Sequence, residues 1–423
     1  MPGDSPWLAA ATGLDRSQTP VVPVVDLSQL EATESTSRPR DISDFRAMIT
    51  RIDPSTSILH IAQDAPTDQE WDELGRRFTN LRRLHVSTGF DENWTDEHFP
   101  LSWPLQLLII SDAAGELVST PAVVEGRVEH LVLFLTCGLR FEGPKTRDMM
   151  KKAVPVGIWN RETKTWRDAE EASRMAFWNK LIADAESQNM FAQGDGPGNE
   201  IKVFSVPAEL EKWMVEKYGK PFELTDQDKP DTRMSALTIL ENDAIETFLR
   251  LTLAHFHVVA RLENLTLRST RHRMESMRGL LAQTFPVLAN LKTLHLTLGD
   301  ILFDMGDPNE SLRNLPPNLE ALHFRGPVSL APLIDTWIEA FAEPSVLPSL
   351  KRLSFVLDLG PYDNTTVEVE KLRVGKDACR RFLGVATARG VTVEEFHDPW
   401  AKGVIPMFKD VDTRWAELDK EPS

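Results

Sequence analysis

Cysteine and tyrosine are the rarest side chains of this 423-residue chain, which contains two of each. The two cysteines, Cys137 and Cys379, cannot build a disulfide framework, and so low a count is typical of a reducing compartment. No stretch of about 18 consecutive apolar residues could span a bilayer. Residues 1–25 also lack the basic start and apolar run of a signal peptide. We therefore expect an intracellular protein, cytoplasmic or nuclear, with no membrane partner.

Positive charge is also in short supply. Lys and Arg number 47 against 64 Asp and Glu, so the formal net charge is −17. Broad contact with phosphate backbones needs clustered Lys and Arg, and we expect no nucleic-acid partner. The acidic balance is otherwise typical of a soluble surface.

Short catalytic and metal-binding motifs are missing as well. The sequence contains no Gly-x-Ser-x-Gly and no His-Glu-x-x-His. The glycines of Gly194–Gly198 are not followed by Lys-Ser/Thr, so they do not form a phosphate loop. His255 and His257 stand two residues apart, a spacing that does not place two ligands on one helix face. We expect no metal, no cofactor and no enzymatic activity.

The chain does contain one repeated sequence motif, Leu-x-x-Leu-x-Leu, which we call the phrase. It occurs seven times with small variations. Its last two apolar positions are two residues apart, so both side chains point to one face of an extended strand. A strand this short cannot bury a core alone, so the copies must stack edge to edge. The seven copies are Leu81–Val86, Leu105–Ile110, Val128–Leu133, Leu262–Leu267, Leu291–Leu296, Leu319–Phe324 and Leu350–Phe355.

The spacing of the copies supports stacking. The second leucines lie 24, 23, 29, 28 and 31 residues apart, counted from Leu84 to Leu108 to Leu131 and from Leu265 through Leu294 and Leu322 to Leu353. The phrase and its period resemble the leucine-rich repeat family, whose units are roughly 20–29 residues long. The resemblance implies an α/β fold: an irregular solenoid with parallel strands on a concave face, helices on a convex face and a mid-chain insertion. An ordinary α/β sheet is the alternative.

Two departures qualify the resemblance. The family's Asn or Cys, three residues after the last apolar position, is replaced by residues such as Gly89, Thr270 and Asp358. An irregular horseshoe-shaped solenoid without this row of Asn or Cys side chains is similar to the substrate-binding halves of F-box proteins. No F-box motif opening with Leu-Pro is present near the start of the chain.

Composition divides the chain into five parts. Residues 1–40 are rich in Pro, Ser and Thr and predict a mobile tail with one adhesive segment near Val21–Leu27. Apolar residues at helical spacing in 41–52 predict a helix that caps the N-terminal end of the stack. The insertion is the region in which the regular spacing of the phrase breaks down. The expected parts are the tail 1–40, the cap and first repeat block 41–139, the insertion 140–235, the second block 236–396 and a C-terminal cap or tail 397–423.

The residue between the paired apolar positions points to the concave face, and four of eight such positions hold His. One hypothesis is a histidine stripe that recognises a partner or senses pH near neutrality; the alternative is that His simply tolerates strands. Basic residues at the strand starts could favour an acidic partner, or could form weak cross-strand ion pairs. The candidate binding residues are His60, Arg83, His85, Thr266, Lys292, His295, His323, Lys351 and Ser354.

These patterns favour a non-catalytic scaffold that binds another protein through its concave strand face and is a monomer on its own. A different class stays open: an enzyme with its site in 140–260 and the repeats as support. A partly decayed repeat protein without a dedicated partner is a third possibility.

Overall fold

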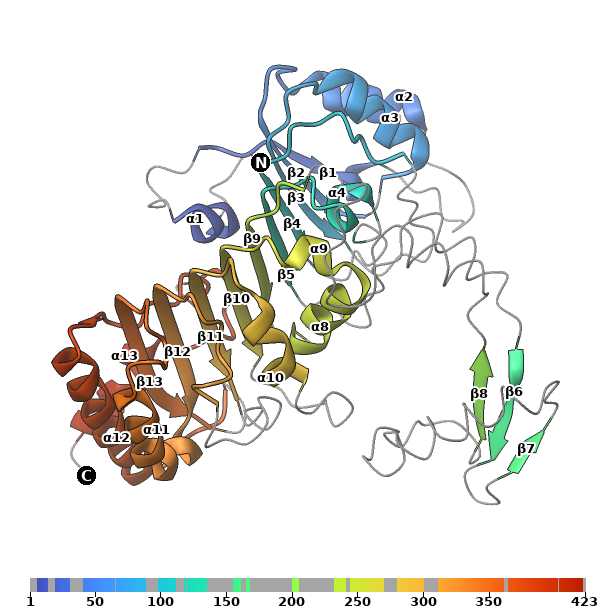
Figure 1. Cartoon of the computed structure of the whole chain (residues 1–423). Coiled ribbons are helices and arrows are strands. Elements are labelled where there is room, and N and C mark those ends of the chain that lie inside the picture. Colours follow the sequence, from blue (N-terminus) through green and yellow to red (C-terminus); the bar gives the residue numbers. More distant parts are fainter. Residues whose placement is uncertain are drawn as a thin grey trace.

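The structure is a computed structural model of the whole chain (Figure 1). It describes residues 6–13, 20–30, 41–64, 66–88, 98–111, 118, 120–134, 155–160, 165–167, 200–204, 232–240, 244–269, 280–299, 311–360, 364–401 and 403–420.

One open sheet of eleven parallel strands dominates the molecule. Its strands follow the chain order without any crossing (Figure 1). The predicted α/β class and the stacked parallel strands are confirmed. In spatial order the strands are β1 (Val24–Asp26), β2 (Ile58–Gln63), β3 (Arg83–Thr88), β4 (Leu107–Ser111), β5 (His130–Phe134), β9 (Ala236–Leu240), β10 (Asn264–Ser269), β11 (Thr293–Leu298), β12 (Ala321–Pro327), β13 (Arg352–Leu359) and β14 (Thr392–Val393).

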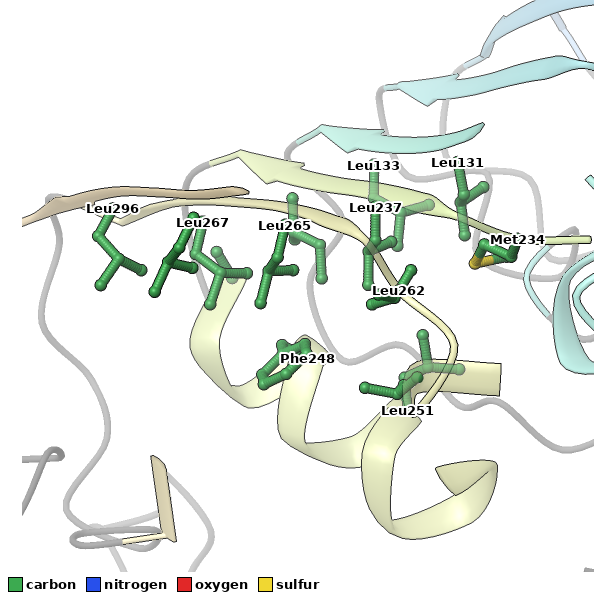
Figure 2. Close-up of a cluster of buried hydrophobic side chains, with 14 of the residues drawn as sticks. Leu131, Leu133, Met234, Leu237, Phe248, Leu251, Leu262, Leu265, Leu267 and Leu296 are labelled. Carbon is green, nitrogen blue, oxygen red and sulfur yellow. The ribbon is translucent and has the colours of Figure 1, made fainter. Parts of the chain in front are cut away.

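The register puts the repeated phrase in line. Leu84 lies opposite Leu108, and Leu294 lies opposite Leu322, with every second residue pointing the same way. Leucines of β5, β9 and β10 point toward the side of the sheet on which helix α8 carries Phe248 and Leu251 (Figure 2). The core of the sheet is therefore the layer between these leucines and the helices.

Helices cover one face of the sheet (Figure 1). The capping box that Thr67 and Glu70 predict is present at the start of α3. The helices of this layer are α2 (Ile42–Thr50), α3 (Asp68–Arg77), α4 (Pro121–Val124), α8 (Ala244–Ala254), α9 (Phe256–Val259), α10 (Leu280–Thr284), α11 (Ile334–Ala342) and α12 (Val369–Ala388), with 3-10 turns at Leu27–Gln29, Phe285–Val287 and Val328–Leu333. Among the described residues no helix is long and apolar enough to cross a membrane.

An asparagine ladder exists, but at another position from the one expected. Asn290 and Asn318 stand directly before the first leucine of a phrase. Their side-chain amides donate to the carbonyls of Ala260 and Ala289 in the preceding repeat, at 2.7 and 2.8 Å. The ladder therefore satisfies backbone groups at the entry to the strand instead of at its exit.

Strand β9 was missed by the sequence analysis. Its phrase, Met234-Ser-Ala-Leu237-Thr-Ile239, fits the pattern with Met in the first position. Leu237 pairs with Leu131 on one side and Leu265 on the other, so the sheet runs straight from β5 to β9. The segment assigned to the insertion thus leaves and re-enters the sheet at adjacent strands.

Within that segment the structure describes a second, three-stranded antiparallel sheet, in the order β7-β6-β8. The polar stretch 160–165, flanked by Trp159 and Trp166, is typical of a hairpin, and these two tryptophans are partners in the antiparallel pairing of β6 and β7. The spacing of apolar residues also predicts helices over 168–187 and 205–219, and both ranges lie outside the described residues. The strands are β6 (Pro155–Asn160), β7 (Thr165–Arg167) and β8 (Glu200–Phe204).

Both termini differ from expectation. Within the predicted mobile tail, helix α1 (Pro6–Thr12) is formed and β1 adds an edge strand to β2. The C-terminal part, expected to cover the far end of the stack, runs back across the sheet before ending in α13 (Val411–Trp415) and a 3-10 turn (Ala416–Asp419). Buried long-range contacts, not local sequence pattern, account for both differences.

Candidate functional site

The predicted row of side chains exists as a continuous line across the sheet. Cross-strand register places His60 beside His85 and His295 beside His323. In order, the row contains His60, His85, Ile109, Val132, Thr238, Thr266, His295, His323 and Ser354. We call the sheet face that carries this row, opposite α8 and α12, the strand face.

The histidines form two stacked pairs. The ring centroids of His60 and His85 are 4.2 Å apart with an interplanar angle of 5°, and those of His295 and His323 are 3.9 Å apart at 20°. Such stacking favours neutral imidazoles, because two adjacent charged rings would repel.

Hydroxyl groups on the neighbouring strand accompany these rings. The Nε2 atom of His60 lies 2.7 Å from the Ser87 Oγ, and that of His85 lies 3.0 Å from the Ser111 Oγ. The Nδ1 atom of His323 lies 2.7 Å from the Ser354 Oγ. For His60 and His85 the hydroxyl stands two residues beyond the register partner, and the sequence alone carries this spacing.

Burial keeps the row uncharged. It lowers the pKa of His60 and of His323 to about 4 and that of His295 to about 3. The pKa of His85 falls well below its ordinary value for the same reason, with the nearby His60 adding a smaller effect. The lowered pKa values favour neutral rings near neutral pH and so argue against the pH-sensing form of the stripe hypothesis, which stays a prediction.

The basic residues at the strand starts form cross-strand ion pairs. Lys292 contacts Glu263 at 2.9 Å, and Lys351 contacts Glu320 at 2.7 Å. All four side chains are largely exposed, so each pair adds little stability. This row of alternating charges, which we call the charged rim, is the exposed border of the strand face.

Helix α1 lies on the strand face, on the opposite side of the sheet from α8 and α10 (Figure 1). The Trp7 ring centroid is 5.4 Å from that of His85 and 4.9 Å from that of Phe134. Leu8 is buried in the same apolar cluster as Ile109 of β4. The N-terminal segment therefore covers the first histidine pair.

Residues 396–411, which we call the C-terminal strap, cover the middle of the strand face. Trp400 and Phe408 are buried in that same cluster, against apolar side chains that β4, β5 and β9 direct outward. These strand residues are Leu107, Ile109, Val132, Phe134 and Leu240. Trp400 also meets Trp7, with ring centroids 5.8 Å apart, so the two covering segments touch.

Two buried arginines of the strand face anchor the strap. The Nε of Arg268 donates to Asp398 Oδ2 at 3.0 Å, and its guanidinium lies 3.4 Å from the centroid of the Phe408 ring. Arg325 binds Asp358 through two hydrogen bonds of 2.8 and 2.9 Å and donates a third, of 2.9 Å, to the Lys409 carbonyl. Each arginine directly follows the last apolar residue of its phrase, on the outward side of the strand.

The expectation of an open strand face is therefore corrected. Among the nine candidate residues, His85, His323 and Ser354 are buried, and His60, Arg83, Thr266 and His295 are half-buried. Only Lys292 and Lys351 are exposed. The arginines that bind the strap were not among the candidates, because the sequence does not show which segment crosses which strand.

A polar pocket of about 480 Å³ opens beside the start of β9 and β10. Arg233, His257, Arg261 and Glu263 contribute to its lining, and Glu263 is already paired with Lys292. It bears on the enzyme alternative, since it borders the 140–260 region. A second, mostly apolar pocket of about 500 Å³ lies between β13 and the start of α12.

Groups of three or more His, Cys, Asp or Glu able to hold a metal do not occur within the described part of the chain. No protein-family model, curated protein or solved structure matches the chain. Function must accordingly be argued from the geometry of the strand face.

Proposed function

We propose that the protein is an irregular leucine-rich-repeat solenoid that acts as a non-catalytic, intracellular recognition scaffold for another protein. One observation supports this function above the others: the strand face holds a polypeptide segment, the C-terminal strap, through side chains of several strands. A surface that seats one polypeptide has the shape and chemistry to seat another.

The accessible entry to this surface is the charged rim. Lys292 and Lys351 stand at the starts of β11 and β13, and their partners Glu263 and Glu320, at the starts of β10 and β12, alternate with them. Exposed charges of this kind contribute more to association rate and to partner choice than to fold stability. A partner that binds the charged rim must carry positive and negative charges that alternate in the complementary order.

A charge swap tests this proposal. In the variant Glu320→Lys/Lys351→Glu, neither of whose residues lines the polar pocket, the ion pair is retained with reversed polarity, and the fold should remain nearly as stable as the wild type because exposed pairs add little stability. Proteins captured by the wild type from its native cell extract would be purified, and their affinity measured by calorimetry. We expect the swap to weaken binding at least tenfold.

The pocket provides the matched control. The variant Arg233→Ala/Arg261→Ala changes the polar pocket and leaves the Lys292–Glu263 and Lys351–Glu320 pairs in place. Recognition through the rim predicts unchanged partner affinity in this variant. An unchanged affinity in the charge swap, with loss in the pocket variant, would contradict the proposal and favour a site in the 140–260 region.

A further inference from the structure

We propose that the strand face between β5 and β12 is a receptor site for polypeptides that carry an Asp-x-Trp element, and that the C-terminal strap occupies this site in cis. The inference rests on the proposed function and names the kind of partner that the scaffold would recognise. Three features of the described residues carry it: an acid anchor, an indole seat and a strap held by side chains.

The acid anchor is Arg268. Its side chain is 2% exposed, and its Nε donates to Asp398 Oδ2 at 3.0 Å. A guanidinium buried to this degree is strongly destabilising unless a carboxylate meets it. A polypeptide that replaces the strap should therefore present a carboxylate at this point, as Asp398 does.

The indole seat lies next to the anchor. Trp400 is 3% exposed and packs among side chains of β4, β5 and β9 and against Trp7 of α1. The backbone N–H of Trp400 donates to Asp398 Oδ1 at 3.0 Å. One carboxylate therefore accepts from Arg268 and also fixes the turn that places the indole on the sheet. The spacing of acid and indole is thus part of what the surface recognises.

Contacts beyond these two are less selective. Arg325 donates to the carbonyl of Lys409, a backbone group that every residue supplies. The Phe408 ring lies on the Arg268 guanidinium at 3.4 Å, a contact that any aromatic side chain could make. Specificity is consequently concentrated in Asp398 and Trp400.

The strap does not extend the sheet. Its backbone hydrogen bonds within the described residues are local: Ala401 N–H donates to Asp398 O, Ile405 N–H to Trp400 O and Phe408 N–H to Ile405 O. The strap is held to the sheet by side chains, which a second polypeptide could supply equally well. Because tethering in cis gives the strap a high effective concentration, a competitor in trans binds detectably only when the strap is weakened or cut.

The test uses the full chain in three forms and a fluorescent peptide that reproduces residues 394–411. The first form is the wild type, and the second is Asp398→Asn/Trp400→Ala, in which the strap is weakened. The third form carries a protease recognition site inserted at the exposed Glu395, before Asp398 and Trp400, which is cleaved only after the protein has folded and so removes their tether. This third form keeps every native strap side chain, so the test survives even if the double variant is unstable.

Fluorescence anisotropy reports binding in each form. We expect the weakened and the cleaved forms to bind the peptide at least tenfold more tightly than the wild type does. Peptides in which the matching Asp is replaced by Asn, or the matching Trp by Ala, should bind at least tenfold more weakly. Arg268→Met in the cleaved form should abolish the preference for Asp over Asn.

The inference is overturned if the cleaved form, folded by circular dichroism, fails to bind the peptide or binds the Asn and Ala peptides equally well. If the charge swap at the rim still weakens partner binding in that case, the scaffold function stands and only the peptide-receptor inference fails. In the opposite pattern, the cleaved form binds the peptide but the charge swap leaves the affinity of the captured partner unchanged. That result would contradict recognition through the rim and support the receptor site.

Discussion

Arg268 and Asp398 are 130 residues apart in the sequence and form a 3.0 Å ion pair that is almost fully buried on the strand face. This contact fixes the C-terminal strap over β10 and turns a surface that the repeat pattern would leave open into one that is partly filled. The covering also explains why the histidine row is neutral, since the segments above it exclude water.

A double-mutant cycle measures that ion pair. Asp398→Asn in the wild type should lower the free energy of unfolding by about 3 kcal/mol, because Arg268 is left buried without its carboxylate. In an Arg268→Met background the same change should cost less than about 1 kcal/mol. Urea unfolding of the four proteins gives the coupling energy, and equal costs in both backgrounds would show that the two side chains do not interact.

The cycle has a matched control in the exposed pair of Lys292 and Glu263, whose atoms are 2.9 Å apart. Its coupling energy should be only about 0.2–1 kcal/mol. A large difference between the two cycles is expected from burial alone.

Stability should depend on pH through the histidine row. The folded-state pKa of His295 is about 3, against an ordinary value of 6.5, because burial disfavours the charged ring. As the pH falls below 6.5, the unfolded chain binds protons that the folded protein refuses, so stability is full above pH 6.5 and decreases toward acid. Each such histidine contributes a slope of up to about 1.4 kcal/mol per pH unit between pH 6.5 and 5.

Replacement by a residue that does not titrate isolates one histidine. His295→Gln should reduce the slope of unfolding free energy against pH between pH 6.5 and 5, whatever its effect on absolute stability. His98→Gln, at an exposed position where the ring lies 3.1 Å from Asp72 of α3, is the control and should not reduce this slope. An identical slope in wild type and His295→Gln would mean that His295 is accessible to protons in the folded state.

Two glycines of α12 give opposite predictions. A Cβ at Gly375 would lie 2.4 Å from the backbone carbonyl oxygen of Leu357, so Gly375→Ala must push the helix away from β13 and should cost about 1–3 kcal/mol. A Cβ at Gly384 meets no described atom within 4 Å, and Gly384→Ala should stabilise the helix by about 0.5–1 kcal/mol. Thermal unfolding distinguishes the two, and equal shifts would contradict the close packing of α12 on β13.

Much of the sheet could be predicted from the sequence because the phrase in each repeat can be identified from a few consecutive residues. The phrase predicts strand, face and register at once, so Leu294 and Leu322 could be placed side by side without coordinates. Strand β9 was within reach too, since Met234 replaces leucine in an otherwise regular phrase.

The cover of the strand face could not be predicted in the same way. Trp7 and Trp400 are in contact because the two ends of the chain converge on β5. Neither residue lies in a periodic pattern from which its contact partner could be predicted. Asp398 is one acid among 64 acidic residues, so nothing local marks it as the partner of Arg268. Contacts of long sequence separation depend on the whole fold.

Hydrogen exchange of the strap, followed by mass spectrometry on the native protein, tests the central claim most directly. The amides of Trp400, Ile405 and Phe408 all donate hydrogen bonds within a buried segment, and we predict that they exchange far more slowly than in a free peptide of the same sequence. In Asp398→Asn the strap should exchange at least tenfold faster, while β11 and β12 keep their wild-type protection. Exchange of residues 396–411 at the free-peptide rate in the wild-type protein would contradict the account.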